Sequence, residues 1–307
     1  MSVAWVGASV RARLLLRRRI GLEGAVRLAY STSLKEAILG LSGTAYGREL
    51  EPGLGLEAAQ RAVSAATLLH LRLLSGWLPP GGAEFLRALG AWFELANIED
   101  RLAYLNGAEL RPAFDLGGLA SAWPRAAQAV GPAELRDSLA HSAWGDPGGG
   151  SPEEVHLGLR AAWATRVGSA VPEVAHLVSG AVALLLAREL FVTGRPVELL
   201  LGRHVPSVGL QWEQARTFSE LVDGLPARAA WALDGLSGPE ELWRAEVAWW
   251  DRAERDGWEL VRRGREGRTE VVGVVLLLAV DTWRTASALA AAAAGGADLE
   301  EVLGGAR

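Results

Sequence analysis

The sequence contains no cysteine, and its 307 residues include only five histidines. The absence of cysteine excludes disulfide bonds, thiolate nucleophiles and zinc sites with sulfur ligands. No two histidines stand four residues apart, and no His-Glu-x-x-His pattern occurs. We therefore expect neither a metal site nor a bound cofactor.

Sequence motifs of common enzyme classes are also missing. The stretch Gly145–Gly150 lacks the Lys-Ser/Thr ending of a phosphate-binding loop, and no Gly-x-Ser-x-Gly sequence is present. Acidic residues cluster at two places, Glu99–Asp100 and Asp251–Asp256. Neither cluster has the Asp-Asp-x-x-Asp spacing that would hold magnesium around a diphosphate. Both are typical of solvated helix faces with arginine partners. We therefore expect no catalytic site in this chain.

Charge and hydropathy limit the partners. The formal net charge is -5, and 31 basic residues are scattered among 36 acidic ones, which argues against a nucleic-acid partner. Two long apolar runs, residues 174–192 and 271–294, contain charged residues, and Asp281 and Arg284 lie near the middle of the second run. Because a charge at the centre of a bilayer costs roughly 2.5–3.5 kcal/mol, we expect buried helices and no transmembrane segment.

Helix-forming residues dominate the chain. Half of the residues are hydrophobic, and alanine, leucine, arginine and glutamate are abundant, whereas alternating β-branched runs are nearly absent. Ser33 and Glu36 form a capping-box pattern, and long helices are expected over residues 83–106 and 270–294. Most of the 13 tryptophans should lie in the core. The sequence predicts an all-α fold.

Three segments are faintly similar to one another: residues 33–50, 133–147 and 219–236. Each predicts a short helix, a break of small residues and then an aromatic residue. The aromatic residues are Tyr46, Trp144 and Trp231. A spacing of roughly ninety residues exceeds that of common solenoid repeats and suggests three copies of one helical module. Chance similarity among helices rich in leucine and alanine is the alternative.

Long helices that carry an acidic residue and an arginine follow the first and third of these segments. The two pairs are Glu94 with Arg101 and Asp281 with Arg284. After the second segment the corresponding acidic residue is Glu189, without a following asparagine. The middle copy is therefore the most degraded.

Several landmarks are similar to those of one protein family. Residues 4–13 resemble its Ala-Tyr-x-Asn-Ala-Arg-Val-Arg start, although Gly7 and Ser9 replace two polar positions. Residues 41–50 resemble its Leu-x-x-Thr-x-Tyr-x-x-x-Leu segment. Residues 94–102 resemble its acidic-x-x-Asn-Leu-x-x-Leu helix, with the asparagine in place. Near residue 281 the acidic residue and the arginine are kept, but tryptophan replaces the asparagine.

Together, and in order along the whole chain, these motifs resemble the C subunit, named d in eukaryotes, of the V-type and A-type rotary ATPases. The resemblance implies an all-α protein in which three pseudo-repeated helical modules form a funnel-shaped bundle. The corresponding ranges are 1–125, 126–212 and 213–307.

The resemblance also implies a mechanical function. Members of the family are non-catalytic rotor subunits, which couple the central stalk of the soluble ATPase head to the membrane proteolipid ring during ion transport. The nucleotide site and the ion-binding carboxylate belong to other subunits. The implied partners are the proteolipid ring and the central-stalk subunits, and the implied location is cytoplasmic and peripheral to the membrane, through those partners only.

Polar residues on the long helices are candidates for contacts with these partners, because complementary charge fixes the register of an interface that must not slide. The candidate interface residues are Glu94, Asn97, Arg101, Asp281 and Arg284. Pairing between helices inside the chain is the alternative role for each. Two other functions stay open: a helical scaffold unrelated to rotary ATPases, and a terpene-synthase-like enzyme, which would need two magnesium-binding acidic faces around one cavity.

Overall fold

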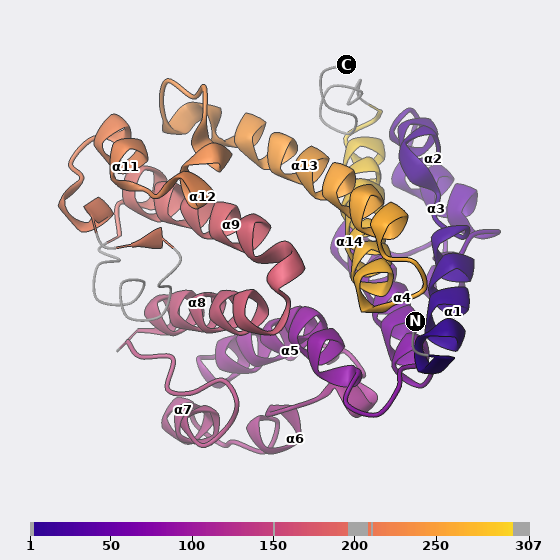
Figure 1. Cartoon of the computed structure of the whole chain (residues 1–307), viewed down its shortest axis with the longest axis horizontal. Helices are drawn as coiled ribbons and strands as arrows, with labels where there is room; N and C mark the ends of the chain where they lie inside the picture. The colour runs from indigo at the N-terminus through magenta and orange to yellow at the C-terminus, as the bar shows by residue number, and fades with distance from the viewer. Residues whose placement is uncertain (1–2, 150, 196–207, 210, 297–307) are drawn as a thin grey trace. The chain divides into compact units, whose positions relative to one another are not determined.

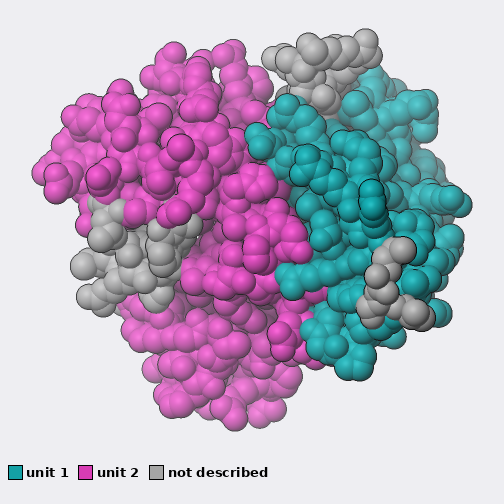
Figure 2. Space-filling model, in the orientation of Figure 1, with its two compact units in different colours: residues 1–83, 250–307 teal, residues 84–249 magenta. Residues whose placement is uncertain are grey.

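The computed structural model describes residues 3–149, 151–195, 208–209 and 211–296 (Figure 1). Within these ranges every regular element is a helix, which confirms the predicted all-α fold. The chain divides into two compact units, residues 1–83 with 250–307 and residues 84–249 (Figure 2). The first unit is therefore built from both ends of the chain. The division into ranges 1–125, 126–212 and 213–307 stays a prediction.

The first unit is organised around α14 (Arg268–Ala293). This helix contacts four helices from the other end of the chain, which Figure 1 draws in indigo and purple. They are α1 (Val6–Leu16), α2 (Gly21–Ala29), α3 (Leu34–Leu41) and α4 (Leu56–Ser75). The unit also contains η1 (Val3–Trp5), η2 (Gly47–Glu49) and the last part of α13 (Leu242–Arg263). A shared core joins the second half of α14 to α2, α3, Tyr46 and α4.

The predicted capping box at the start of α3 is formed with one change. The Ser33 hydroxyl accepts a hydrogen bond from the Glu36 backbone N–H at 3.3 Å, as expected of an N-cap. The Glu36 carboxylate, however, accepts from the backbone N–H of Thr32 at 2.8 Å, one residue earlier than the pattern predicts. The Ser33 hydroxyl therefore satisfies one of the orphan donors at the start of α3, and the Glu36 carboxylate binds the residue before the N-cap.

The second unit begins with α5 (Ala83–Leu105), close to the predicted range of 83–106. The helices α6 (Trp123–Ala126), α7 (Pro132–Ala140) and α8 (Pro152–Ala170) follow and share one core with α5 and Trp144. The rest of the unit contains α9 (Ala175–Arg188), α11 (Phe218–Gly224), α12 (Ala227–Ala230) and the first part of α13. Its short helical turns are η3 (Gly117–Leu119), η4 (Pro172–Val174), η5 (Glu189–Thr193), η7 (Gln211–Gln214), η8 (Trp231–Leu233) and η9 (Pro239–Glu241).

Two helical stretches are long and apolar enough to cross a membrane by length and composition alone. They are Pro172–Thr193, of whose apolar window 56% is buried inside the chain, and Arg268–Ala293, of whose window 67% is buried. Core helices of folded domains pass the same test.

The loop before α8 packs directly on the middle of that helix. A Cβ atom added at Gly158 would lie 1.8 Å from the carbonyl oxygen of Pro147, whereas one added at Gly168, on the same helix, meets nothing within 4 Å. Glycine at position 158 is therefore required by the close approach of the loop backbone.

We expect Gly158→Ala to lower the free energy of unfolding by about 1–3 kcal/mol, because the overpacked loop must move. The matched control is Gly168→Ala, which should raise the free energy of unfolding by about 0.5–1 kcal/mol through helix propensity alone. Urea denaturation of both variants measures these effects. Equal shifts in the same direction would contradict the close contact.

Candidate functional site

A densely hydrogen-bonded polar side chain of the second unit is Glu94, which is 1% exposed on α5. Its carboxylate accepts hydrogen bonds from the backbone N–H groups of Ser121 and Ala122, both at 2.7 Å, and of Trp123 at 2.8 Å. It also accepts from the Ser121 hydroxyl and, at 2.9 Å, from the indole N–H of Trp144. A single buried carboxylate therefore holds the start of α6 and an aromatic ring against α5.

The electrostatic setting keeps Glu94 ionised. Burial by itself raises the pKa of Glu94, but hydrogen bonds from Ser121, Trp123 and Trp144 lower it by more, so the net pKa lies below its ordinary value of 4.5. The guanidinium carbon of Arg166 lies 4.8 Å from the ring centroid of Trp144, on the face of the indole. Burial lowers the pKa of Arg166, and the Glu94 charge opposes that shift.

This pKa predicts a stability loss in acid. The pKa of Glu94 is lower in the folded chain than its ordinary value of 4.5. Ionised Glu94 therefore makes its whole contribution to the free energy of unfolding at pH values above 4.5. The contribution disappears as the pH falls through the lower folded pKa. We expect the difference in urea midpoint between the wild type and Glu94→Gln to be constant from about pH 7 to 5 and to shrink towards about pH 3. A difference in urea midpoint that stays constant down to about pH 3 would contradict a stabilising, ionised Glu94.

The other two candidates on α5 hold the segment between α5 and α7. The side-chain amide of Asn97 donates to the carbonyl of Phe114 at 2.9 Å and accepts from the N–H of the same residue at 2.7 Å. The Arg101 guanidinium donates to the carbonyl of Ala129 at 2.6 Å. Residues 94, 97 and 101 share one helix face, so this face forms a polar ridge on which residues 114–129 are anchored.

A second buried carboxylate lies in the first unit. Asp281 on α14 is 1% exposed and accepts from the backbone N–H groups of Ile20 at 3.1 Å and Gly21 at 2.8 Å. Gly21 begins α2 with a φ of 66°, a conformation that favours glycine. Asp281 also accepts from the Tyr46 hydroxyl at 2.7 Å. Burial first, and then the Asp281 charge, raises the pKa of Tyr46 well above its ordinary value of 10.0, so the phenol remains a donor.

The last candidate, Arg284, joins α14 to α13. Its side chain is 2% exposed and its guanidinium lies 2.7 Å from a Glu254 carboxylate oxygen and 3.8 Å from one of Asp251. Burial raises the pKa of Asp251, against the opposing charge of Arg284. Beside this pair, the rings of Trp250 and Trp283 stack with centroids 5.1 Å apart.

The centres of Glu94 and Asp281 are built alike. In each, an acidic residue on a long helix accepts from the N–H groups that begin a short helix, and from an aromatic donor located beyond the next short helix. The aromatic donors, Trp144 and Tyr46, are two of the three flagged by the faint repeat. The cores around the two centres also correspond, because each joins two long helices, two short helices and that aromatic residue.

The third aromatic position is different. The indole N–H of Trp231 donates to the carbonyl of His176 at 3.4 Å. Glu189 instead accepts from the Thr193 hydroxyl at 2.9 Å and from Arg195 at 3.5 Å. Part of the corresponding segment, residues 196–207, lies outside the described residues. The described contacts of Trp231 and Glu189 therefore differ from those of their counterparts in the two carboxylate centres.

The interface role of these residues stays a prediction. Glu94, Asn97, Asp281 and Arg284 are each 1% exposed, and each has the contacts inside the chain that are described above. Arg101 is partly exposed. The five do not form one cluster: three lie on α5 in one unit and two on α14 in the other. Sequence reasoning missed Ser121, although Pro124 in the first turn of α6 signals a helix start there.

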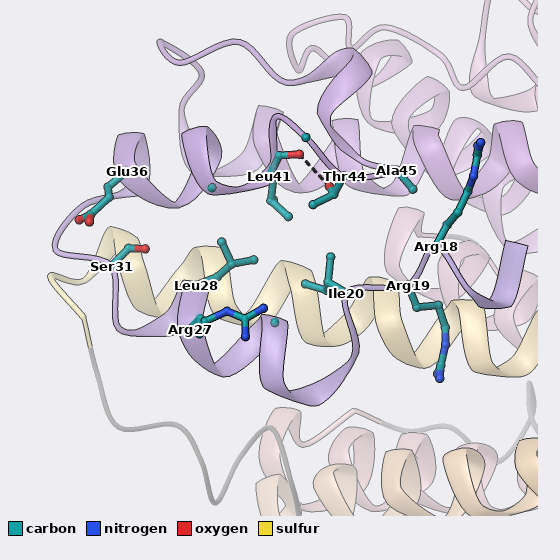
Figure 3. A pocket seen from close by; sticks show the side chains of 13 residues that line it. Arg18, Arg19, Ile20, Arg27, Leu28, Ser31, Glu36, Leu41, Thr44 and Ala45 are labelled. Atoms are coloured by element: carbon teal, nitrogen blue, oxygen red, sulfur yellow. Dashed lines mark hydrogen bonds between the residues drawn. The ribbon is translucent and has the colours of Figure 1, made fainter.

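The first unit also contains a surface pocket of about 750 Å³ beside α2 and α3 (Figure 3). Ile20, Leu28 and Leu41 line it, and the Thr44 hydroxyl donates to the Leu41 carbonyl at 2.7 Å. Arg18 and Arg19 lie at one end, with side chains that point in opposite directions. The pocket therefore has a mixed lining of polar and apolar residues, with Arg18 and Arg19 at one end.

Among the residues that the structure describes, no group of three or more His, Cys, Asp or Glu side chains is placed to hold a metal ion. Comparison with known proteins finds neither a family model nor a curated protein that matches this chain.

Proposed function

We propose that this chain is a non-catalytic central-stalk component of a V-type or A-type rotary ATPase, similar to the C (eukaryotic d) subunits of those enzymes. It would couple the stalk of the soluble head to the proteolipid ring during ion transport. The observation that carries the proposal is the repeated carboxylate centre. Its residues Glu94, Asp281 and Tyr46 belong to the same sequence landmarks that resemble the family, and a family of pseudo-repeated helical modules accounts for a centre that occurs twice.

The physical requirements of a torque coupler support the same proposal. Such a part must transmit force without deforming, and a buried carboxylate whose donors are all oriented towards it resists displacement of the elements it joins. Asp281 joins the last long helix to the beginning of α2, 260 residues earlier in the sequence. The first unit is thereby closed by both ends of the chain, so that α1–α4 cannot separate from α14 without exposing a buried charge.

The test is recovery of a tagged copy from detergent-solubilised membranes of the source organism, with bound proteins identified by mass spectrometry. We expect a small proteolipid together with stalk and nucleotide-binding subunits, and weaker recovery at higher salt, because charged contacts are screened. A tagged helical protein of similar size controls for adhesion to detergent micelles. Recovery of the chain alone, from an extract that contains an intact rotary ATPase, would overturn the proposal and favour the helical scaffold.

A further inference from the structure

The outer face of α1 is apolar although it is exposed. Val6, Val10 and Leu14 recur every four residues and are 37%, 48% and 47% exposed. The opposite face of the same helix is also apolar, since Ala8, Ala12 and Leu15 are buried. An ordinary surface helix places polar residues on its outer face. The apolar outer face of α1, here called the α1 stripe (Val6, Val10 and Leu14), therefore needs a separate explanation.

The end of α4 extends this apolar surface. Trp77 is 56% exposed, and a Cβ atom added at Gly7 would lie 3.5 Å from its ring, so the indole packs beside the start of the α1 stripe. Leu73, four residues earlier, is 44% exposed. A patch of several neighbouring, exposed apolar side chains marks an interaction surface.

The sequence that contains the stripe is rich in arginine. Residues 4–22 contain five arginines and no acidic residue, although the whole chain has a net charge of -5. Arg13 is paired with Glu270, and Arg19 lies 3.9 Å from Glu254. Arg17 and Arg18 are exposed and form no ion pair with any described residue. Two uncompensated cations therefore follow the apolar stripe at the end of the same helix.

We propose that the α1 stripe, together with Leu73, Trp77, Arg17 and Arg18, docks on the surface of a bilayer that contains anionic lipid. Apolar side chains insert at the boundary between headgroups and acyl chains, and arginine pairs with anionic headgroups. Tryptophan prefers this boundary because its ring is apolar and its N–H is polar. Charge complementarity favours this occupant. This contact is direct, in addition to any association through partner subunits, and it does not depend on the rotary-ATPase assignment.

The test is co-sedimentation of the purified full chain with vesicles of phosphatidylcholine alone or with roughly 30% phosphatidylglycerol. We expect binding to the anionic vesicles only, and loss of that binding between about 0.1 M and 1 M salt. Arg17→Gln with Arg18→Gln should weaken binding about 30-fold. Val10→Asp should weaken it at least tenfold, because a charged group would enter the apolar boundary. Leu39→Asp, at a position 50% exposed on α3, is the matched control and should bind like the wild type.

Unchanged helical circular dichroism of each variant ensures that binding, and not folding, is compared. Failure of the wild type to bind anionic vesicles would overturn the proposal, as would equal losses in Val10→Asp and Leu39→Asp. The wild type could fail to bind vesicles while Val10→Asp loses a protein partner in the membrane pull-down. In that case the α1 stripe is a protein interface and the lipid proposal is wrong. The vesicle assay contains no ATPase subunit, so its result is independent of the proposed function.

Discussion

Replacement of Glu94 by glutamine should lower the free energy of unfolding by about 3–5 kcal/mol, the range for loss of one member of a buried, hydrogen-bonded charged set. The carboxylate accepts from three backbone amides, the Ser121 hydroxyl and the Trp144 indole. Glutamine presents one oxygen and one NH₂ group, and an NH₂ group cannot accept from a donor. At least one buried N–H group would lose its partner, and the start of α6 would shift away from α5.

Urea denaturation at neutral pH measures this loss. The matched control is Glu84→Gln, the same substitution on the same helix at a position outside the core, which should change the free energy of unfolding by less than about 0.5 kcal/mol. Trp144→Phe removes one donor and keeps the ionised acceptor, so its effect should be smaller than that of Glu94→Gln. A loss in Glu94→Gln no larger than in Glu84→Gln would show that the carboxylate does not organise the second unit.

Asp281→Asn should lower the free energy of unfolding by about 2–4 kcal/mol, because asparagine leaves one or more buried donors unpaired. The donors are the Ile20 and Gly21 backbone N–H groups and the Tyr46 hydroxyl. The loss should be accompanied by release of α2 from α14, since two of these donors lie at the start of α2. Hydrogen exchange of α2 amides should therefore accelerate more than exchange in α5.

A double-mutant cycle separates the bond between Asp281 and Tyr46 from the rest of this loss. Asp281→Asn, Tyr46→Phe and the double variant should give a coupling energy of about 1–3 kcal/mol, as is typical for residues in one buried hydrogen-bond network. Tyr46 is 2% exposed, so removal of its hydroxyl from an otherwise intact centre should also cost stability. A coupling energy near zero would mean that the hydroxyl and the carboxylate contribute independently.

Two centres of the same construction in one chain change how the faint repeat is interpreted. The sequence associates each aromatic residue with the long helix that follows it. In the structure Trp144 pairs with Glu94 on the long helix that precedes it. Tyr46 pairs with Asp281 on α14, 235 residues later in the chain. Glu94 and Trp144 thus fall in different predicted ranges, as do Asp281 and Tyr46. The bond between Glu94 and Trp144 thus joins the first predicted range to the second, and the bond between Tyr46 and Asp281 joins the first to the third.

Local sequence was sufficient for the helices and their starts. Spacing of apolar residues, helix propensity and caps such as Ser33 act over only a few residues, so they can be recognised without knowledge of the fold. These signals predicted an all-α chain. Glu94 and Asp281 were singled out by the faint repeat and by the resemblance to a protein family, as candidate interface residues.

The partners of these residues, however, depended on the folded chain. Tyr46 and Asp281 stand 235 residues apart, and no local pattern can state which of several aromatic donors reaches a given carboxylate. The same holds for burial, because the sequence places Glu94 on a helix but only packing against α6, α7 and α8 removes it from solvent. Long-range pairing follows from the joint packing of all helices, and this packing gives Glu94 and Asp281 the internal contacts that hold each unit together.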